Sequence, residues 1–184
     1  CKLRQWHKDH PATVISVTHD PREAWALGDR VAVMSGGRVL QVGPPGEIHR
    51  KPSIGFVAKF FAQGPMNYFS VQLRKEGNSL QWRAGRWPHA IPHQNGMPDK
   101  GEAVLGLRAE HVRIGGPSEL TMHVTLVEPT PQGCWVSGDI DGLPWTGWAE
   151  RTVSVGQKVG IMIDWTKAYL FDAESDQTLY APAG

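Results

Sequence analysis

One histidine in the chain has the type and the position for phosphate chemistry. His19 lies in the stretch TVISVTHDPREAW, Thr13 to Trp25, where an apolar run meets polar residues and then a helical pattern. A neutral imidazole keeps a proton on one ring nitrogen, so it can donate a hydrogen bond to a phosphate oxygen or orient a water molecule. A structural histidine at a capped turn is the alternative, and the spacing does not separate the two.

The elements around His19 are predicted to hold it at the edge of a sheet. The apolar run 14–17 is typical of a short strand buried on both faces in a parallel sheet. Asp20 is a favourable helix N-cap, Pro21 a favourable first helical residue, and Glu23 follows at the capping-box position. His19 would then stand where an open α/β sheet usually binds its ligands.

Other residues with metal-like or phosphate-like spacing are weaker candidates. His7 and His10 have no acidic or cysteine partner near them, and the prolines beside His89 and His93 predict a loop there rather than a helix. We therefore expect no metal site. Gly36 and Gly37 separate two β-rich runs, so they predict a hairpin turn and not the start of a phosphate-binding helix.

Composition limits the class of protein. The chain has 184 residues, 40% of them hydrophobic, and a formal net charge of +1, which suits one or two soluble domains and gives no electrostatic case for nucleic acid. It has no apolar run long enough for direct membrane insertion. Two cysteines are too few for a disulfide framework. Because the first residue is Cys1 and not Met, we interpret the chain as a fragment, with a lipid-bearing cysteine as the alternative.

The pattern of the sequence changes near residues 63–66. Residues 1–63 mix helical and strand patterns, as at the end of an α/β domain, whereas residues 64–184 contain short strands separated by Gly, Pro and Asp turns. The second part predicts a small antiparallel barrel or sandwich. No glycine-rich phosphate loop and no nucleophile elbow occur anywhere in the sequence.

An extended stretch resembles a known family. VISVTHDPREAWALGDRVAVMSGGRVLQVGPPGEIHRKP is similar to the last third of an ATP-binding cassette (ABC) ATPase, with the THD junction matching the switch-histidine loop. KLR at 2–4 resembles the segment after the D-loop. FVAKFFAQGPMNYF and AVLGLRAEHVRI resemble the junction and regulatory domain of importer ATPases for sugars and glycerol phosphate, and YLFDAESDQTL resembles their usual end. The resemblance is weakest over 74–101.

The resemblance implies a fold and a role. Residues 1–63 would be the α/β remnant of the cassette, and residues 64–184 an all-β OB-like (TOBE) regulatory and dimerisation domain. His19 would be the catalytic switch histidine, which contacts the ATP γ-phosphate in a complete cassette. The full-length protein would use ATP and Mg²⁺ and work with transmembrane permease subunits and a second ATPase copy. It would lie in the cytoplasm, peripherally on the inner face of a bacterial membrane.

The resemblance also shows what this sequence lacks. In the family the phosphate loop, Q-loop, signature and catalytic carboxylate precede this segment, and none is present here. We therefore expect the chain alone neither to bind ATP tightly nor to hydrolyse it, so no cofactor is expected for it by itself. A stand-alone regulatory or solute-sensing OB-type module without ATPase activity is one alternative, and an inert remnant is another.

Two groups in the second part invite a ligand-site interpretation. Arg108, Glu110 and His111 alternate with apolar residues in LRAEHV, as on a half-buried strand. We interpret them as a salt bridge and turn that fix this strand against the cassette, with a ligand site as the alternative. Tryptophans are abundant and are interpreted as core rather than as a sugar-binding face. They are Trp82, Trp87, Trp135, Trp145, Trp148 and Trp165.

Overall fold

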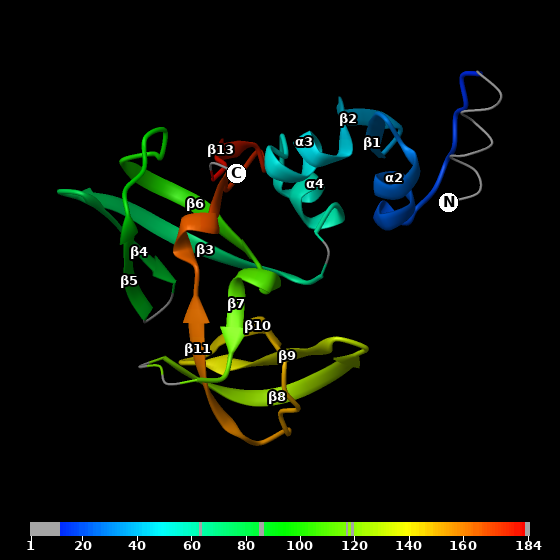
Figure 1. Cartoon of the computed structure of the whole chain (residues 1–184). Helices are drawn as coiled ribbons and strands as arrows, with labels where there is room; N and C mark the ends of the chain where they lie inside the picture. The colour runs from blue at the N-terminus through cyan, green and yellow to red at the C-terminus, as the bar shows by residue number, and fades with distance from the viewer. Residues whose placement is uncertain (1–11, 63, 85–86, 117, 119, 183–184) are drawn as a thin grey trace.

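The fold is mostly β with few helices and includes a closed five-stranded barrel. A computed structural model describes residues 12–62, 64–84, 87–116, 118 and 120–182 (Figure 1). The first part contains α2 (Pro21–Leu27), β1 (Val31–Ser35), β2 (Arg38–Gly43), α3 (Pro45–Arg50) and α4 (Gly55–Phe60). A six-stranded sheet contains β3 (Met66–Glu76), β4 (Ser79–Ala84), β5 (Trp87–Pro92), β6 (Lys100–Arg108), β12 (Tyr169–Asp172) and β13 (Thr178–Tyr180). The barrel contains β7 (Val112–Ile114), β8 (Thr121–Thr130), β9 (Gly133–Ile140), β10 (Leu143–Ala149) and β11 (Lys158–Ile163).

Local sequence signals explain the helix that follows His19. Asp20 is the N-cap of α2, and its carboxylate accepts a hydrogen bond from the Arg22 amide. Glu23 does not complete the predicted capping box. Its carboxylate accepts a hydrogen bond from the Thr18 hydroxyl at 2.6 Å, and the Asp20 amide donates to the same hydroxyl at 3.0 Å. The start of the helix is therefore fixed by a threonine and an aspartate.

The predicted strand before His19 is absent, and this expectation was wrong. Residues 12–17 are neither helix nor strand, and Ile15 and Val17 are 88% and 95% exposed. A strand needs a neighbour that accepts and donates its backbone hydrogen bonds. No strand of the described residues pairs with this run. Over residues 12–62, the chain thus contains helices and one hairpin, and no parallel sheet.

The hairpin and two short helices share a small core. β1 and β2 pair antiparallel, and the predicted turn is confirmed because Gly36 and Gly37 have φ angles of 54° and 74°, which only glycine adopts at little cost. The helices α3 and α4 pack on this hairpin. The buried members of the core are Val33, Ile48, Val57 and Phe61.

Backbone contacts join this helical part to the sheet. The amide of Gly55, which begins α4, donates to the Asp176 carbonyl at 2.9 Å, and the Phe56 amide donates to the Asp176 carboxylate at 2.8 Å. The Thr178 amide donates to the Ser53 carbonyl at 3.0 Å. A turn close to the end of the chain therefore holds the start of α4 in place.

The sheet has the strand order β13-β12-β6-β3-β4-β5. Its longest pairing joins β3 to β6, from Met66 opposite Arg108 to Arg74 opposite Lys100. β5 corrects the prediction of a loop around His89. Proline lacks an amide donor but is tolerated in an edge strand, and β5 is the last strand of this sheet.

The barrel closes in the order β10-β7-β11-β8-β9. The β7–β10 pair is parallel and the other pairs are antiparallel. Sequence reasoning predicted one barrel or sandwich, whereas the chain forms a barrel and a separate sheet. The two are connected twice, because β6 runs through the 3₁₀ turn η1 (Ala109–His111) into β7, and β11 runs through η2 (Trp165–Lys167) into β12.

Tryptophans fill the interior where the sheet meets the barrel. Trp145 of β10 is 1% exposed and its ring centroid lies 4.5 Å from that of Phe69 in β3. Trp82 is 2% exposed and lies 5.4 Å from Trp165. The interpretation as core is confirmed for Trp82 and Trp145. Among the described residues, no helix is long and apolar enough to cross a membrane.

Candidate functional site

His19 lies at the surface, directly before α2. It is exposed, and its side chain makes no hydrogen bond to another described residue. A shallow hollow of about 430 Å³ surrounds it, lined by His19, Asp20, Pro21, Arg22 and Ala62. Arg22 and Asp20 form an ion pair at 3.0 Å, and hydrogen bonds from Arg22 lower the pKa of the Asp20 carboxyl.

The hollow offers little to a nucleotide by itself. The His19 imidazole can donate one hydrogen bond to a phosphate oxygen. The Arg22 guanidinium is already bound to Asp20, whose carboxylate would repel a phosphate. The described residues of this hollow therefore do not fit ATP and Mg²⁺ alone.

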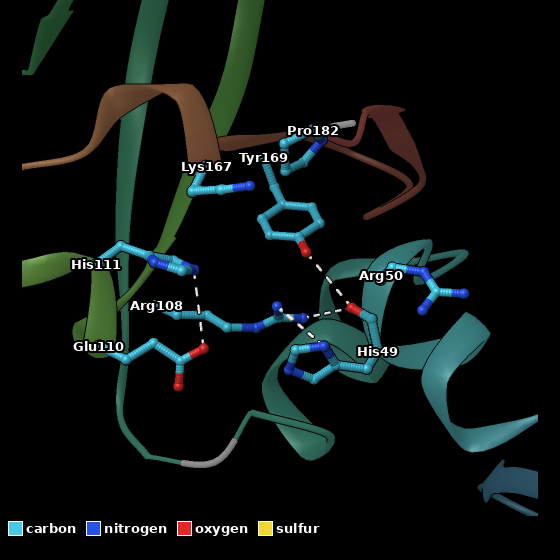
Figure 2. A pocket seen from close by; sticks show the side chains of 8 residues that line it. All are labelled: His49, Arg50, Arg108, Glu110, His111, Lys167, Tyr169 and Pro182. Atoms are coloured by element: carbon cyan, nitrogen blue, oxygen red, sulfur yellow. Dashed lines mark hydrogen bonds and ion pairs between the residues drawn. The ribbon is translucent and has the colours of Figure 1, made fainter. Parts of the chain in front are cut away.

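A second site lies between α3 and the end of β6, and Figure 2 shows its side chains. Arg108, the last residue of β6, is 3% exposed. Its Nη2 donates to the His49 carbonyl at 2.5 Å, and its Nη1 lies 3.5 Å from the His49 Nδ1. The guanidinium lies over the Tyr169 ring, 5.0 Å from the centroid, as in a cation–π contact. Arg108 thus connects the helix α3 to the strands β6 and β12 of the sheet.

These contacts surround a pocket of about 230 Å³. Across it, the Glu110 carboxylate lies 3.8 Å from the His111 Nε2 (Figure 2). The residues that line the pocket are His49, Arg50, Arg108, Glu110, His111, Lys167, Tyr169 and Pro182. Three are permanent cations and one is a carboxylate, so the lining is predominantly positive.

The two histidines of the pocket favour the neutral form. Burial, reinforced by the nearby Arg108, lowers the pKa of His49 to about 4. Burial also lowers the pKa of His111, although Glu110 opposes this shift. A positive neighbour and a low-polarity environment both disfavour imidazolium. At neutral pH the positive charge of the pocket therefore comes from its arginines and lysine.

The structure changes the interpretation of the LRAEHV segment. Arg108, Glu110 and His111 do not share a continuous strand, because β6 ends at Arg108 and a 3₁₀ turn follows. Among the described residues no carboxylate forms an ion pair with Arg108. Its partner is instead the carbonyl of His49 on α3. Whether these residues bind a ligand stays a prediction.

Sequence reasoning missed five of the eight residues that line this pocket. His49 is 59 positions before Arg108, and Tyr169 is 120 positions after His49. No spacing rule connects such distant residues, so only the tertiary fold reveals them. Of the weaker candidates, His7 and His10 lie outside the described residues. The part of the chain that the structure describes contains no metal-like group of three His, Cys, Asp or Glu side chains.

Comparisons with known proteins find relatives among import ATP-binding proteins. No family model matches the chain. The sn-glycerol-3-phosphate import ATP-binding protein UgpC 1 of Rhizobium johnstonii is 35% identical over 98% of this chain and 50% of its own length. The trehalose/maltose import ATP-binding protein MalK of Thermococcus litoralis is 29% identical over 97% of this chain and 52% of its own length. The chain spans about half the length of these curated relatives.

A solved structure with a partly similar fold is one of the structural matches. The cytoplasmic molybdate-binding protein ModG with molybdate bound is 14% identical, with a TM-score of 0.44 over 59% of this chain and 95% of that protein. The sequence matches run through both the helical part and the β part described above. Along almost its whole length, the chain is similar to the C-terminal portion of ATP-binding subunits of sugar and glycerol-phosphate ABC importers.

Proposed function

We propose that this chain supplies the C-terminal half of the ATP-hydrolysing subunit of an ABC importer for a sugar or a glycerol phosphate. The observation that carries the proposal is the match over 98% of the chain to half of an importer ATP-binding protein at 35% identity. In this proposal residues 1–63 complete a cassette, and residues 64–184 form the regulatory and dimerisation domain.

The exposed apolar run before His19 supports the proposal. Val14 is 52% exposed, and Ile15 and Val17 more so, yet the run has the composition of a buried strand. In a longer chain it would pair with strands contributed by the other half of the cassette. That pairing would hold His19 at the edge of a complete sheet, where ligands of α/β folds bind.

In the complete cassette, His19 would donate a hydrogen bond to the γ-phosphate and orient the attacking water. This is a positioning and electrostatic role, as in phosphoryl transfer generally. ATP and Mg²⁺ would be held mainly by residues of the other half. The partners would be permease subunits and a second ATPase copy, with the protein in the cytoplasm against the membrane.

A chimera tests this proposal. The N-terminal half of the Rhizobium johnstonii relative is fused to this chain, and ATP turnover is measured for the chimera and for the chain alone. We expect turnover only in the chimera, and a decrease of about 100-fold for His19→Ala, the usual range for a lost positioning or proton-transfer group.

The matched control is His123→Ala, which removes another exposed histidine from β8 and should leave turnover unchanged. Turnover by the isolated chain that depends on His19 would contradict the proposal. An active chimera that is indifferent to His19→Ala would contradict the assigned role of His19.

A second candidate function is a stand-alone sensing module without ATPase activity. The observation that favours it is the extensive core that the sheet and barrel share, from Phe69 to Tyr180, which is built without the first part of the chain. Equal ligand responses of the isolated chain and the chimera, with no turnover in either, would support this candidate.

A further inference from the structure

We propose that the pocket between α3 and the barrel connection is an oxyanion site that binds a phosphate group, with Arg108 and Lys167 as its principal ligands. The pocket is separate from the hollow of His19, since the two share no lining residue. The inference therefore goes beyond the ATPase role and does not depend on it.

The first argument is the unused donor capacity of a buried cation. Arg108 is 3% exposed, and its Nε is buried without a hydrogen-bond partner among the described residues. The carbonyl of His49 and the ring of Tyr169 are neutral partners. Burial of a charge is costly unless an opposite charge or a set of hydrogen bonds compensates it. An anion in the pocket would supply that compensation.

The second argument is the charge of the lining. The lining contains three cations, Arg50, Arg108 and Lys167. Its carboxylate is that of Glu110, which lies 3.8 Å from the His111 Nε2. Figure 2 shows Arg108 crossing the pocket, with Lys167 on the far side near the Tyr169 ring, whereas the Arg50 guanidinium points outward. The excess positive charge is thus concentrated on Arg108 and Lys167, and it suits an anion with more than one negative charge.

The third argument is the type and arrangement of the donors. A guanidinium presents parallel N–H groups that match two oxygens of a phosphate, and an ammonium adds a point charge from another direction. The Tyr169 hydroxyl lies 3.4 Å from the His49 carbonyl and can turn its proton to a ligand. A volume of about 230 Å³ is several times the ≈30 Å³ of a water molecule, so a phosphate group has room.

The position of the pocket gives such binding a consequence. Its lining comes mainly from α3, from the end of β6 and η1, and from η2 and the start of β12. A bound phosphate group would connect the helical part to both links between sheet and barrel. Ligands that bind only the folded state stabilise it by mass action. Phosphate should therefore raise the midpoint of thermal unfolding of the chain.

The test is calorimetric titration of the full chain with inorganic phosphate at constant ionic strength, with chloride as the compensating anion. We expect saturable binding at one site per chain. Lys167→Gln should weaken it about tenfold, as expected for the loss of one charge-assisted contact. Arg108→Lys, which keeps the charge and loses the fork, should weaken it by at least as much. Glycerol 3-phosphate, titrated in parallel, distinguishes a phosphate ester from free phosphate by which of the two binds more tightly.

The matched control is Lys158→Gln, which removes an exposed lysine of β11 and changes the net charge equally. Its affinity for phosphate should equal that of the unmodified chain. Absence of saturable binding would overturn the proposal. Equal weakening by Lys167→Gln and Lys158→Gln would also overturn it, since the effect would then be general electrostatics and not a site.

Discussion

The two parts of the molecule treat their apolar side chains differently. In residues 12–43 several large apolar side chains remain exposed, among them Val17 at 95% and Met34 at 58%. In the sheet and barrel, tryptophans as large as Trp82 and Trp145 are almost completely buried. The second part therefore encloses a core of its own, whereas the first part leaves large apolar side chains on its surface.

Strand edges give the same contrast. The barrel has no edge, because its five strands close on themselves. The hairpin of β1 and β2 is a two-stranded sheet with both edges unpaired among the described strands. Such hairpins are marginally stable alone, and unpaired edges favour association with further strands. The four predictions that follow test this contrast, beginning with the largest effect.

The largest effect is expected for the same substitution made in each part. Trp145→Ala should lower the free energy of unfolding by about 4 kcal/mol, because it leaves a cavity in the shared core of sheet and barrel. Trp25→Ala should cost only about 1 kcal/mol, because that ring is 40% exposed. Urea denaturation measures both. Equal losses would show that the two parts are packed alike.

The next effect concerns the polar link between sheet and barrel. Asn67 of β3 is 6% exposed, its amide donates to the Thr146 carbonyl at 2.9 Å, and its side-chain oxygen accepts from the Thr146 amide at 2.7 Å. Asn67→Ala removes both side-chain hydrogen bonds to the half-buried Thr146 backbone and should cost about 3 kcal/mol.

The control for this variant is Gln72→Ala on the same strand, since Gln72 is exposed and its side-chain amide donates a hydrogen bond to the exposed side chain of Glu102. It should change stability by about 0.5 kcal/mol or less. Denaturation in urea compares the two variants. Similar losses of stability in the two variants would mean that the Asn67 side chain does not connect the sheet to the barrel.

A third comparison adds one methyl group to a glycine of each part. A Cβ at Gly138 in β9 would overlap the carbonyl oxygen of His123, whereas one at Gly46 in α3 meets only the Arg50 side chain at 3.5 Å. Gly138→Ala should therefore destabilise by about 2 kcal/mol, and Gly46→Ala should stabilise by about 0.5 kcal/mol. Thermal unfolding midpoints measure both effects. A higher midpoint for Gly138→Ala than for Gly46→Ala would contradict the prediction.

The smallest effect is a pH dependence at the boundary between the two parts. His49 has a pKa of about 4 in the folded chain, compared with about 6.5 when unfolded. Between these values the unfolded state binds more protons, so His49 lowers stability as the pH falls from about 6.5 toward 4. Arg108, Arg50 and His111 are the charged or titratable groups that contribute to the shift.

Because the ring is partly exposed, the loss should be about 1 kcal/mol, less than the full shift implies. Urea denaturation of the chain and of His49→Gln, at pH 7 and pH 4.5, isolates this contribution. The variant should lose less stability on acidification than the unmodified chain. Identical losses of stability in the two proteins would show that His49 does not contribute to the pH dependence.

Local signals in the sequence predicted what local physics determines. The predicted hairpin turn at Gly36 and Gly37 was correct, since both residues have positive φ angles. The predicted helix start at Asp20 was also correct. Most β strands followed from alternation and turn residues. The prediction of a strand at 14–17 was wrong because such a strand needs neighbouring strands, and none pairs with this run among the described residues. The prediction of a loop at β5 was wrong because proline is tolerated in an edge strand.

The candidate sites divide in the same way. His19 was identified from a single contiguous stretch, and its role remains a proposal. The oxyanion pocket needs His49, Arg108 and Tyr169 together, and these come from three distant elements. Long-range contacts of this kind leave no periodic signal in a sequence, so the sequence singled out only Arg108, Glu110 and His111, which lie in one short segment.

Amide hydrogen exchange of residues 13–18 tests the proposal that the first part of the chain pairs with the other half of a cassette. In the isolated chain these amides should exchange nearly as fast as in an unfolded peptide, whereas those of β9 should be protected. In the chimera with the relative's N-terminal half, residues 13–18 should become protected. Protection in the isolated chain, or continued fast exchange in an ATP-hydrolysing chimera, would contradict the account.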